Sequence, residues 1–262
     1  MSAQMPPGGS GNDCIGPGSH RSTLSVGQPD AIVPSAARPR LLDLFCGAGG
    51  AAMGYHDAGF DVTGVDIEPQ PHYPFTFVQA DALTFPLDGF DAIHASPPCE
   101  AFTQMSARWR GKGGLADTHK DLLTPTLARL RGLLVPWVVE NVPSAKRAMR
   151  PTVDLHGGMF GLGVYRRRIF ESNILILVPK MRAPDRPIGV YGDHPQNHYS
   201  TRLNGDMKGR RSEFRRARTI DEARELMEMP WADWNGCRKA IPPAYTRLIG
   251  AQLLEHLSER IT

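Results

Sequence analysis

The sequence predicts an open, doubly wound α/β sheet, and two features of its order support this fold class. First, a short apolar run at 41–45 is followed by a glycine-rich turn at 46–50 and a helix-like segment at 51–58. A strand, a glycine-rich turn and a helix in this order are typical of the nucleotide-binding start of such a sheet. Second, later apolar runs each end in a polar side chain, as expected where parallel strands present their carboxyl ends to a ligand.

The next elements continue this pattern. The run 61–66 predicts a second strand that ends in a carboxylate, and 75–78 predicts a third, with Asp81 beyond its end. A fourth strand at 92–95 is stopped by the Pro97–Cys99 turn. Proline lacks a backbone N–H and has a nearly fixed φ, so this turn is stiff and can hold the thiol in one place, as a nucleophile requires.

Beyond this turn, the helical spacing of Lys120 to Leu133 precedes a strand at 136–142. That strand carries Glu140 and Asn141 toward the same edge of the sheet. Polar groups at several neighbouring strand ends predict a ligand site there, because ligands of open α/β sheets bind at the carboxyl edge.

The last third of the chain predicts two further strands and two helices. A strand beginning near Arg168 would place Arg166 and Arg168 on one face, because side chains alternate along a strand. The apolar run 174–178 predicts one more buried strand. A capping box at 219–222 opens a helix through Met227. Pro243 starts the final helix, and an apolar stripe should pack that helix against the first domain: Tyr245, Leu248, Ile249, Leu253 and Leu257.

Composition excludes several classes of protein. Hydrophobic residues at 41% and charged residues at 22% are ordinary for a folded domain. The four cysteines are widely spaced without a CxxC pair, which argues against a disulfide framework and against a metal site. Neither a signal peptide nor a membrane-spanning run is evident, so we expect a cytoplasmic protein without membrane contact.

Residues 1–38 and 179–218 differ from the rest of the chain. The first segment is rich in Gly, Pro, Ser and Gln and predicts a disordered tail. From 180 to 218 there are ten basic and four acidic residues, whereas the whole chain has a net charge of only +3. This run predicts an irregular insert that binds a phosphate backbone. The expected organisation is therefore a tail at 1–38, a catalytic domain at 39–178, the basic insert at 179–218, and C-terminal helices at 219–262 that return to the catalytic domain.

The ordered motifs of the chain resemble those of DNA cytosine-5 methyltransferases. The motifs are Leu42-Asp-Leu-Phe-Cys-Gly-Ala-Gly-Gly50, Pro97-Pro-Cys99, Glu140-Asn-Val142, Arg166-Arg-Arg168 and Pro243-Ala-Tyr-Thr-Arg-Leu-Ile-Gly250. The basic insert falls where that family places its target-recognition region, and its small size is most similar to the short phage and prophage members. Three positions depart from the family pattern: Glu100 replaces a glutamine, Val164 or Tyr165 stands where a glutamine precedes the arginines, and Ala251-Gln252 replaces Asn-Ser.

The resemblance implies a Rossmann-like, S-adenosylmethionine-dependent methyltransferase domain that methylates C5 of cytosine in double-stranded DNA. Its implied catalytic residues are Cys99, Glu140, Arg166 and Arg168. Its implied cofactor-binding residues are Phe45, Cys46, Gly47, Ala48, Gly50, Asp66, Ile67, Asp81, Ala82 and Pro98. We expect a monomer that flips its target base out of the helix, with a cognate restriction enzyme as a conceivable partner.

Three other interpretations share parts of this pattern. A tRNA cytosine-5 methyltransferase would use the same scaffold and a similar basic insert. A catalytically silent DNA-binding relative would keep the insert, but it would not need both Cys99 and Glu140. An NAD oxidoreductase fits the glycine-rich turn, yet it leaves the Pro-Cys turn and the basic insert unexplained.

Overall fold

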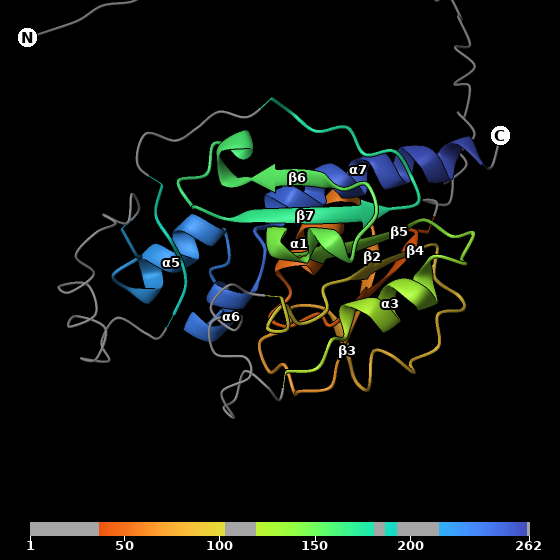
Figure 1. The fold of residues 1–262 in the computed structure, drawn as a ribbon, viewed down its shortest axis with the longest axis horizontal. Helices are drawn as coiled ribbons and strands as arrows, with labels where there is room; N and C mark the ends of the chain where they lie inside the picture. Colours follow the sequence, from red (N-terminus) through yellow and green to blue (C-terminus); the bar gives the residue numbers. More distant parts are fainter. Residues whose placement is uncertain (1–36, 103–118, 181–186, 193–214, 261–262) are drawn as a thin grey trace, which may run out of the picture. The chain divides into compact units, whose positions relative to one another are not determined.

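A seven-stranded sheet forms the centre of the protein in a computed structural model, which describes residues 37–102, 119–180, 187–192 and 215–260 (Figure 1). Its strands are β1 (Arg40–Leu44), β2 (Asp61–Asp66), β3 (Thr76–Gln79), β4 (Ala92–Ala95), β5 (Trp137–Asn141), β6 (Val153–His156) and β7 (Arg167–Ser172). Its helices are α1 (Gly50–Ala58), α3 (Leu123–Leu130), α5 (Ile220–Met227), α6 (Trp234–Lys239) and α7 (Pro243–Glu259), with short 3₁₀ turns η2 (Pro143–Arg147) and η3 (Gly157–Phe160).

The strand order confirms the predicted doubly wound α/β fold. The order is β3-β2-β1-β4-β5-β7-β6, and the five strands from β3 to β5 run parallel. From β1 the chain winds outward to β2 and β3, then returns to place β4 on the other side of β1. The winding therefore reverses between β1 and β4, and the loops after these two strands meet at the point where such sheets bind ligands.

Side chains that alternate along the strands build a separate core on each face of the sheet. One face packs under α1 and α7, which also pack against each other, and its buried residues include Leu41, Val62, Val138, Phe170, Tyr55, Tyr245, Ile249 and Leu253. The opposite face packs against α3, with Leu42, Val65, Ile93, Val139, Leu123, Leu127 and Leu130. Burial on both faces explains why the central strands are continuous apolar runs.

Capping residues set the starts of two helices in the C-terminal part of the chain. The Thr219 hydroxyl accepts from the Glu222 N–H at 3.1 Å and starts α5. Likewise, the Asp233 carboxylate accepts from the Gly236 N–H at 2.6 Å and starts α6. Both helices contribute to a third buried cluster, which also includes Val164 and Val190.

The apolar run 174–178 is not the buried strand that its composition predicts. Only Ile176 is buried, whereas Leu175 and Leu177 are 80% and 68% exposed. The segment is instead fixed to α7, because the Gln252 side chain bonds both the N–H and the carbonyl of Leu177. Arg167–Ser172 occupies the strand position next to β5, with β6 beyond it at the edge of the sheet.

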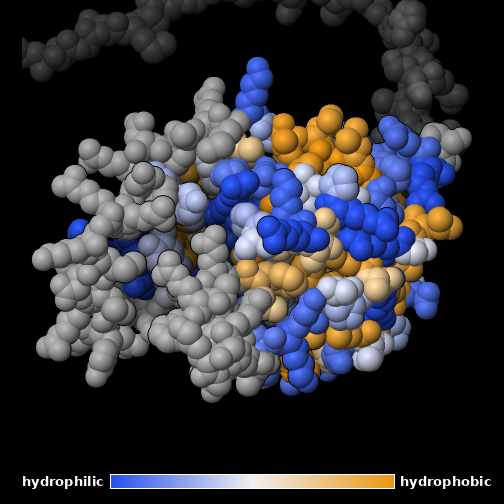
Figure 2. Space-filling view, in the orientation of Figure 1, coloured by the Kyte–Doolittle hydropathy of each residue, from blue (hydrophilic) through white to orange (hydrophobic). Residues whose placement is uncertain are grey.

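The predicted tail and most of the predicted basic insert lie outside the described residues. Two short pieces of the insert, 187–192 and 215–218, are described. Ile188 forms a bridge with Val164 of the catalytic domain, and Gly189 forms a bridge with Arg216, which joins the two pieces to each other. Figure 2 shows hydrophilic and hydrophobic residues side by side on the described surface of one face. Leu134 and Leu175 are among the exposed large hydrophobic residues of the described chain. None of the described helices is long and apolar enough to cross a membrane.

Candidate active site

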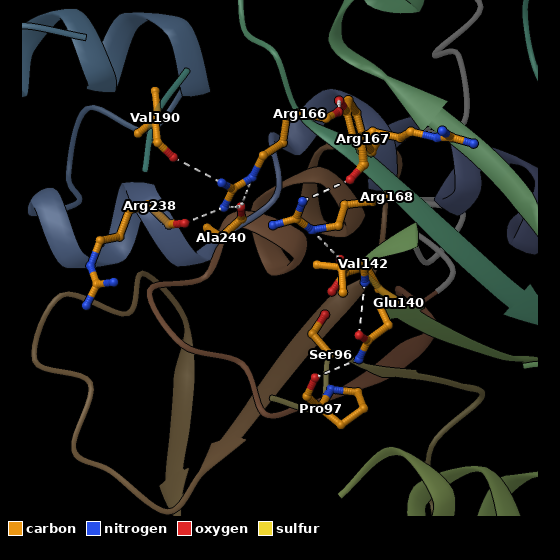
Figure 3. Close-up of polar contacts among 12 residues, drawn as sticks. Ser96, Pro97, Glu140, Val142, Arg166, Arg167, Arg168, Val190, Arg238 and Ala240 are labelled. Carbon is orange, nitrogen blue, oxygen red and sulfur yellow. Dashed lines mark hydrogen bonds and ion pairs between the residues drawn. The ribbon is translucent and has the colours of Figure 1, made fainter. Parts of the chain in front are cut away.

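The Pro97–Cys99 turn is held against the neighbouring strand by an amide side chain. Asn141, the last residue of β5, donates from Nδ2 to the Pro97 carbonyl at 3.0 Å, and its Oδ1 accepts from the Val142 N–H at 2.9 Å (Figure 3). Beyond the prolines, the Phe102 N–H donates to the Cys99 carbonyl at 2.9 Å and closes the next turn. The position of Cys99 is thus fixed by backbone restriction and by β5.

A buried ion pair lies beside this turn. Glu140 is 7% exposed, and its Oε1 lies 2.7 Å from Nε of Arg168. The pairing of β5 with β7 explains the contact, because Glu140 lies opposite Phe170 and Arg168 is two residues from Phe170 on the same face. The structure therefore brings together two of the residues expected in the site, Glu140 and Arg168.

Burial and the neighbouring arginines have opposite effects on the pKa values of Glu140 and Cys99. Burial raises the pKa of Glu140, and Arg168, Arg166 and a hydrogen bond from Ser96 act in the opposite direction. Burial also raises the pKa of the Cys99 thiol, with Glu140 and Glu100 adding to the increase, whereas Arg168 and Arg166 lower it. The thiol is therefore mostly protonated at neutral pH in the free protein, and Arg168 is the main cation that favours the thiolate.

Arg166 makes different hydrogen bonds from Arg168, although both were expected as catalytic residues, and both lower the pKa of the Cys99 thiol. Its guanidinium donates to the carbonyls of Val190, Arg238 and Ala240, and Figure 3 shows it directed away from Glu140. Burial is the main reason that its pKa falls to about 9. Arg166 thus links the start of β7 to the connection between α6 and α7.

The glycine-rich turn after β1 has an unusual backbone. Phe45 and Gly47 have positive φ values of 58° and 48°, and nothing lies within 4 Å of a Cβ built on Gly47. For a residue such as Phe45 this conformation is strained and persists only where the surroundings impose it. The Asp66 carboxylate, at the end of β2, accepts from the Gly47 N–H at 3.0 Å and from the Glu68 N–H at 3.0 Å. Asp66 therefore holds the turn and leaves open space beside Gly47.

Of the other residues expected around a cofactor, three are exposed and one is buried. Ile67 is 64% exposed, next to Asp66, and Asp81 is exposed, with its carboxylate accepting from the Leu83 N–H at 2.9 Å. Pro98 is also exposed, whereas Ala82 is buried. These residues lie after β2, β3 and β4, on the carboxyl side of the sheet.

Three residues of the turn face the protein rather than open space. A Cβ on Gly50 would lie 2.3 Å from the Ile241 carbonyl, so this glycine packs against the C-terminal segment. The Ala48 carbonyl accepts from Trp231 Nε1 at 2.8 Å. Cys46 is buried, and burial raises the pKa of its thiol far above the usual value. Sequence reasoning did not foresee the contacts of Ala48 and Gly50, whose partners Trp231 and Ile241 lie in the C-terminal part of the chain.

Sequence reasoning also missed a set of buried polar residues behind Glu140. His94 and Tyr55 are fully buried and hydrogen-bonded to each other, and His94 also contacts the Ser96 hydroxyl. The only signal in the sequence is a histidine inside the apolar run of β4. Within the described parts of the chain, no group of three His, Cys, Asp or Glu side chains is arranged to hold a metal ion.

Solved structures of methyltransferases share this fold. The Entamoeba histolytica methyltransferase EhMeth aligns with a TM-score of 0.51 and 12% identity over 86% of this chain and 99% of that one. The Dnmt2 methyltransferase of S. pombe aligns with a TM-score of 0.50 and 15% identity over 84% and 99%. An E. coli prophage protein, assigned as a DNA modification methyltransferase, is 22% identical at a TM-score of 0.39 over 58% of this chain, which spans only 53% of that protein. No protein-family model and no curated protein matches the sequence.

Proposed function

We propose that this chain transfers a methyl group from S-adenosylmethionine to C5 of cytosine in double-stranded DNA, through a covalent bond between Cys99 and C6 of the base. One observation carries the proposal: the Pro97–Cys99 turn and the Glu140–Arg168 pair lie at the ends of adjacent strands, beside the reversal point that also holds the glycine-rich turn. A stiffly held thiol, a buried carboxylate and a cation at one edge are the groups that this reaction requires.

The turn after β1 fits the expected cofactor. The open space at Gly47 allows a ligand to approach the backbone closely, and the exposed Ile67 side chain offers an apolar surface for an adenine ring. Asp66 and Asp81 provide carboxylates after β2 and β3 for a ribose and an adenine amino group. When bound there, S-adenosylmethionine supplies an electrophilic methyl group.

Cys99 would start the reaction as a nucleophile. Its thiolate, favoured by Arg168, adds to C6 and moves the electron pair of the C5–C6 double bond onto C5, where the methyl group is received. C5 then loses its proton to water, the double bond re-forms, and the bond between C6 and sulfur breaks to release Cys99. The thiol takes up a proton again at the end of the cycle.

Glu140 would hold the target base while charge develops on the ring. Its buried carboxyl can bond N3 and the exocyclic amine of cytosine, and its pKa, raised by burial, makes a shared proton at N3 accessible. A base in a duplex cannot reach such a group, so the target must leave the helix at a cost of about a few kcal/mol. Lys and Arg side chains of the basic run at 180–218 would bind the DNA backbone.

DNA with 5-fluorocytosine at a target site tests this reaction directly. Methyl transfer places a methyl group and fluorine together on C5, fluorine cannot leave as a cation, and elimination of Cys99 is blocked. We expect a covalent protein–DNA adduct, visible by denaturing gel electrophoresis, with S-adenosylmethionine but not with NAD. Bisulfite sequencing of DNA from cells that express the protein would identify the target site.

Two cysteine variants assign the nucleophile. Cys99→Ser should form no adduct, because a serine hydroxyl is barely ionised at neutral pH. The matched change Cys46→Ser should still form it, since Cys46 is buried in the turn after β1. Absence of an adduct with the wild-type protein on methylatable DNA would refute the proposed reaction, and an adduct through another cysteine would refute the role of Cys99.

A further inference from the structure

A chain of buried hydrogen bonds leads from α1 to the Glu140 carboxylate. The Tyr55 hydroxyl lies 3.0 Å from Nδ1 of His94, and Nε2 of His94 lies 2.8 Å from Oγ of Ser96. The Ser96 side chain lies beside Glu140, as Figure 3 shows, and its hydroxyl lowers the pKa of that carboxyl as a hydrogen-bond donor would; Glu140 is also paired with Arg168. Tyr55 and His94 are both 0% exposed, so these polar groups have been removed completely from water.

The geometry of the sheet places this chain of groups on one face. His94 and Ser96 are two residues apart and therefore point to the same side of β4. His94 lies opposite Val138 of β5, and Glu140 is two residues beyond Val138. The two strands thus carry a polar row across an otherwise apolar face, and Tyr55 of α1 closes its far end.

The donor and acceptor roles along the row have one consistent assignment when Glu140 is ionised. An ionised carboxylate only accepts, so the Ser96 hydroxyl must donate to it. The Ser96 oxygen then accepts from the Nε2–H of His94, and a neutral imidazole with its proton on Nε2 must accept at Nδ1 from the Tyr55 hydroxyl. Every donor therefore points toward Glu140.

This row cannot carry a proton to or from solvent. Burial lowers the pKa of His94 to about 3, so the imidazole remains neutral. Burial and the nearby Asp43 raise the pKa of Tyr55, so its phenol remains protonated. With neutral members and a fully buried end, the row can orient a carboxylate but cannot exchange its proton with water.

We propose that Tyr55, His94 and Ser96 are positioning residues that orient the Glu140 carboxylate toward the target base. This inference rests on the proposed function, and it assigns to the histidine inside β4 the task of fixing the direction of the Ser96 hydroxyl. A merely structural role would satisfy the same buried groups without influencing Glu140. The two roles differ because the last donor of the row reaches the reacting carboxylate.

Variants of Ser96 provide the main test. Ser96→Ala removes the bond to Glu140, and loss of a hydrogen bond to a charged group should lower the single-turnover methylation rate by roughly 10- to 100-fold. The KM for S-adenosylmethionine should remain unchanged, and Ser96→Thr, which keeps the hydroxyl, should restore most of the rate. The matched control is Thr126→Val, which removes another buried hydroxyl, on α3, whose bond goes only to the Leu122 carbonyl.

A second readout does not depend on turnover. In protein with ¹³C-labelled glutamate, the carboxyl signal of Glu140 can be titrated by NMR, with Glu140→Gln used to assign it. Ser96→Ala should raise the pKa of Glu140, by about one unit or more, because a donor to the ionised form has been lost. Tyr55→Phe should raise it too, since His94 can then move its proton to Nδ1 and Ser96 loses the partner that directs its hydroxyl.

The outcomes separate this inference from the proposed function. If the wild-type protein forms no adduct with 5-fluorocytosine DNA, the reaction is wrong, yet the Glu140 titration still decides whether the row acts on the carboxylate. If the adduct forms while Ser96→Ala keeps both the rate and the Glu140 titration of the wild type, the positioning role is refuted.

Discussion

Glu140 has two opposite effects on the proposed reaction, one on the Cys99 thiol and one on the target base. A variant of this single residue can separate them. Its negative charge raises the pKa of the Cys99 thiol, which disfavours the nucleophile. Its carboxyl is also the group proposed to stabilise the attacked base. A variant without the charge should therefore make the thiol more reactive and the proposed methylation slower.

Glu140→Gln should shift alkylation of Cys99 by iodoacetamide to lower pH. Loss of the negative charge also leaves Arg168 without its partner, and both changes favour the thiolate, so the pKa should fall by about one unit or more. The fraction of thiolate at a given pH below the former pKa then increases, whereas single-turnover methylation should fall by roughly 100-fold or more. Mass spectrometry of the Cys99 peptide and single-turnover assays give the two values.

Asp154→Asn is the matched control for this change. Asp154 also pairs with an arginine, Arg167, but the pair is exposed and Arg167 lies on the opposite face of β7 from Arg168. Neither alkylation nor methylation should change in this variant. A Glu140→Gln enzyme in which methylation increases together with alkylation would show that the carboxyl has no part in the reaction.

The sequence could indicate the residues of the proposed site but not the groups that contact them. Cys99, Glu140 and Arg168 belong to short motifs whose chemistry is visible from residue type and order. Arg166 donates to carbonyls of residues that are 24 to 74 positions away. Every residue has a backbone carbonyl, so the sequence does not show which of them will accept. The contacts of His94 could not be predicted either, because the partners of a histidine in an apolar strand are set by the tertiary structure.

Among the elements of the fold, the start of β7 and the C-terminal helices are joined by the hydrogen bonds of Arg166, and a variant of this residue tests how much those bonds contribute to stability. Arg166→Ala leaves the buried carbonyls of Val190, Arg238 and Ala240 without this donor. We expect a loss of about 2–4 kcal/mol in the free energy of unfolding, because unsatisfied buried acceptors are costly. Urea denaturation followed by circular dichroism measures this change.

Arg167→Ala controls for the loss of an arginine at the adjacent position. Its ion pair with Asp154 is exposed, so the change should remain within about 1 kcal/mol. Equal destabilisation by the two variants would mean that the buried carbonyl contacts of Arg166 contribute no more to stability than the exposed ion pair of Arg167.

Elements with clear boundary signals could be predicted, and the others could not. Proline at the start of α7 and the capping threonine of α5 mark real helix starts. In contrast, 174–178 is apolar and short, which suits a strand, but strands β6 and β7 fill the edge beside β5. The competition between segments for one sheet edge is a tertiary effect, and local pattern does not reveal it.

For the whole molecule, the doubly wound fold class was predictable because the strand, glycine-rich turn and helix at its start have a signal of their own, whereas substrate selection depends on charge distribution. The run 180–218 has six more basic than acidic residues, and the chain as a whole is +3, so the remainder carries a net negative charge. A polyanionic substrate should therefore contact this run in preference to other surfaces.

The salt dependence of DNA binding tests this preference. Each Lys or Arg that neutralises a phosphate of B-DNA contributes about 0.9 to the slope of log affinity against log salt concentration. Arg210→Ala combined with Arg211→Ala should therefore reduce the slope by about 1.8 if both residues contact phosphates. Fluorescence anisotropy at several salt concentrations gives the slope.

A second double variant removes the same charge from another part of the chain. Arg247→Ala with Arg260→Ala changes two arginines of the α7 region, where Arg247 pairs with Asp57 and Arg260 donates to the Leu134 carbonyl. This variant should keep the wild-type slope, because neither arginine belongs to the basic run. It also controls for net charge, since a general effect of charge would change the slope equally in both double variants. Equal slopes for the two variants would remove Arg210 and Arg211 from the interface.

Competition by folded tRNA tests which nucleic acid is the substrate. We expect DNA that contains the target site to bind more tightly than tRNA, and the opposite order would make RNA the substrate of the same site.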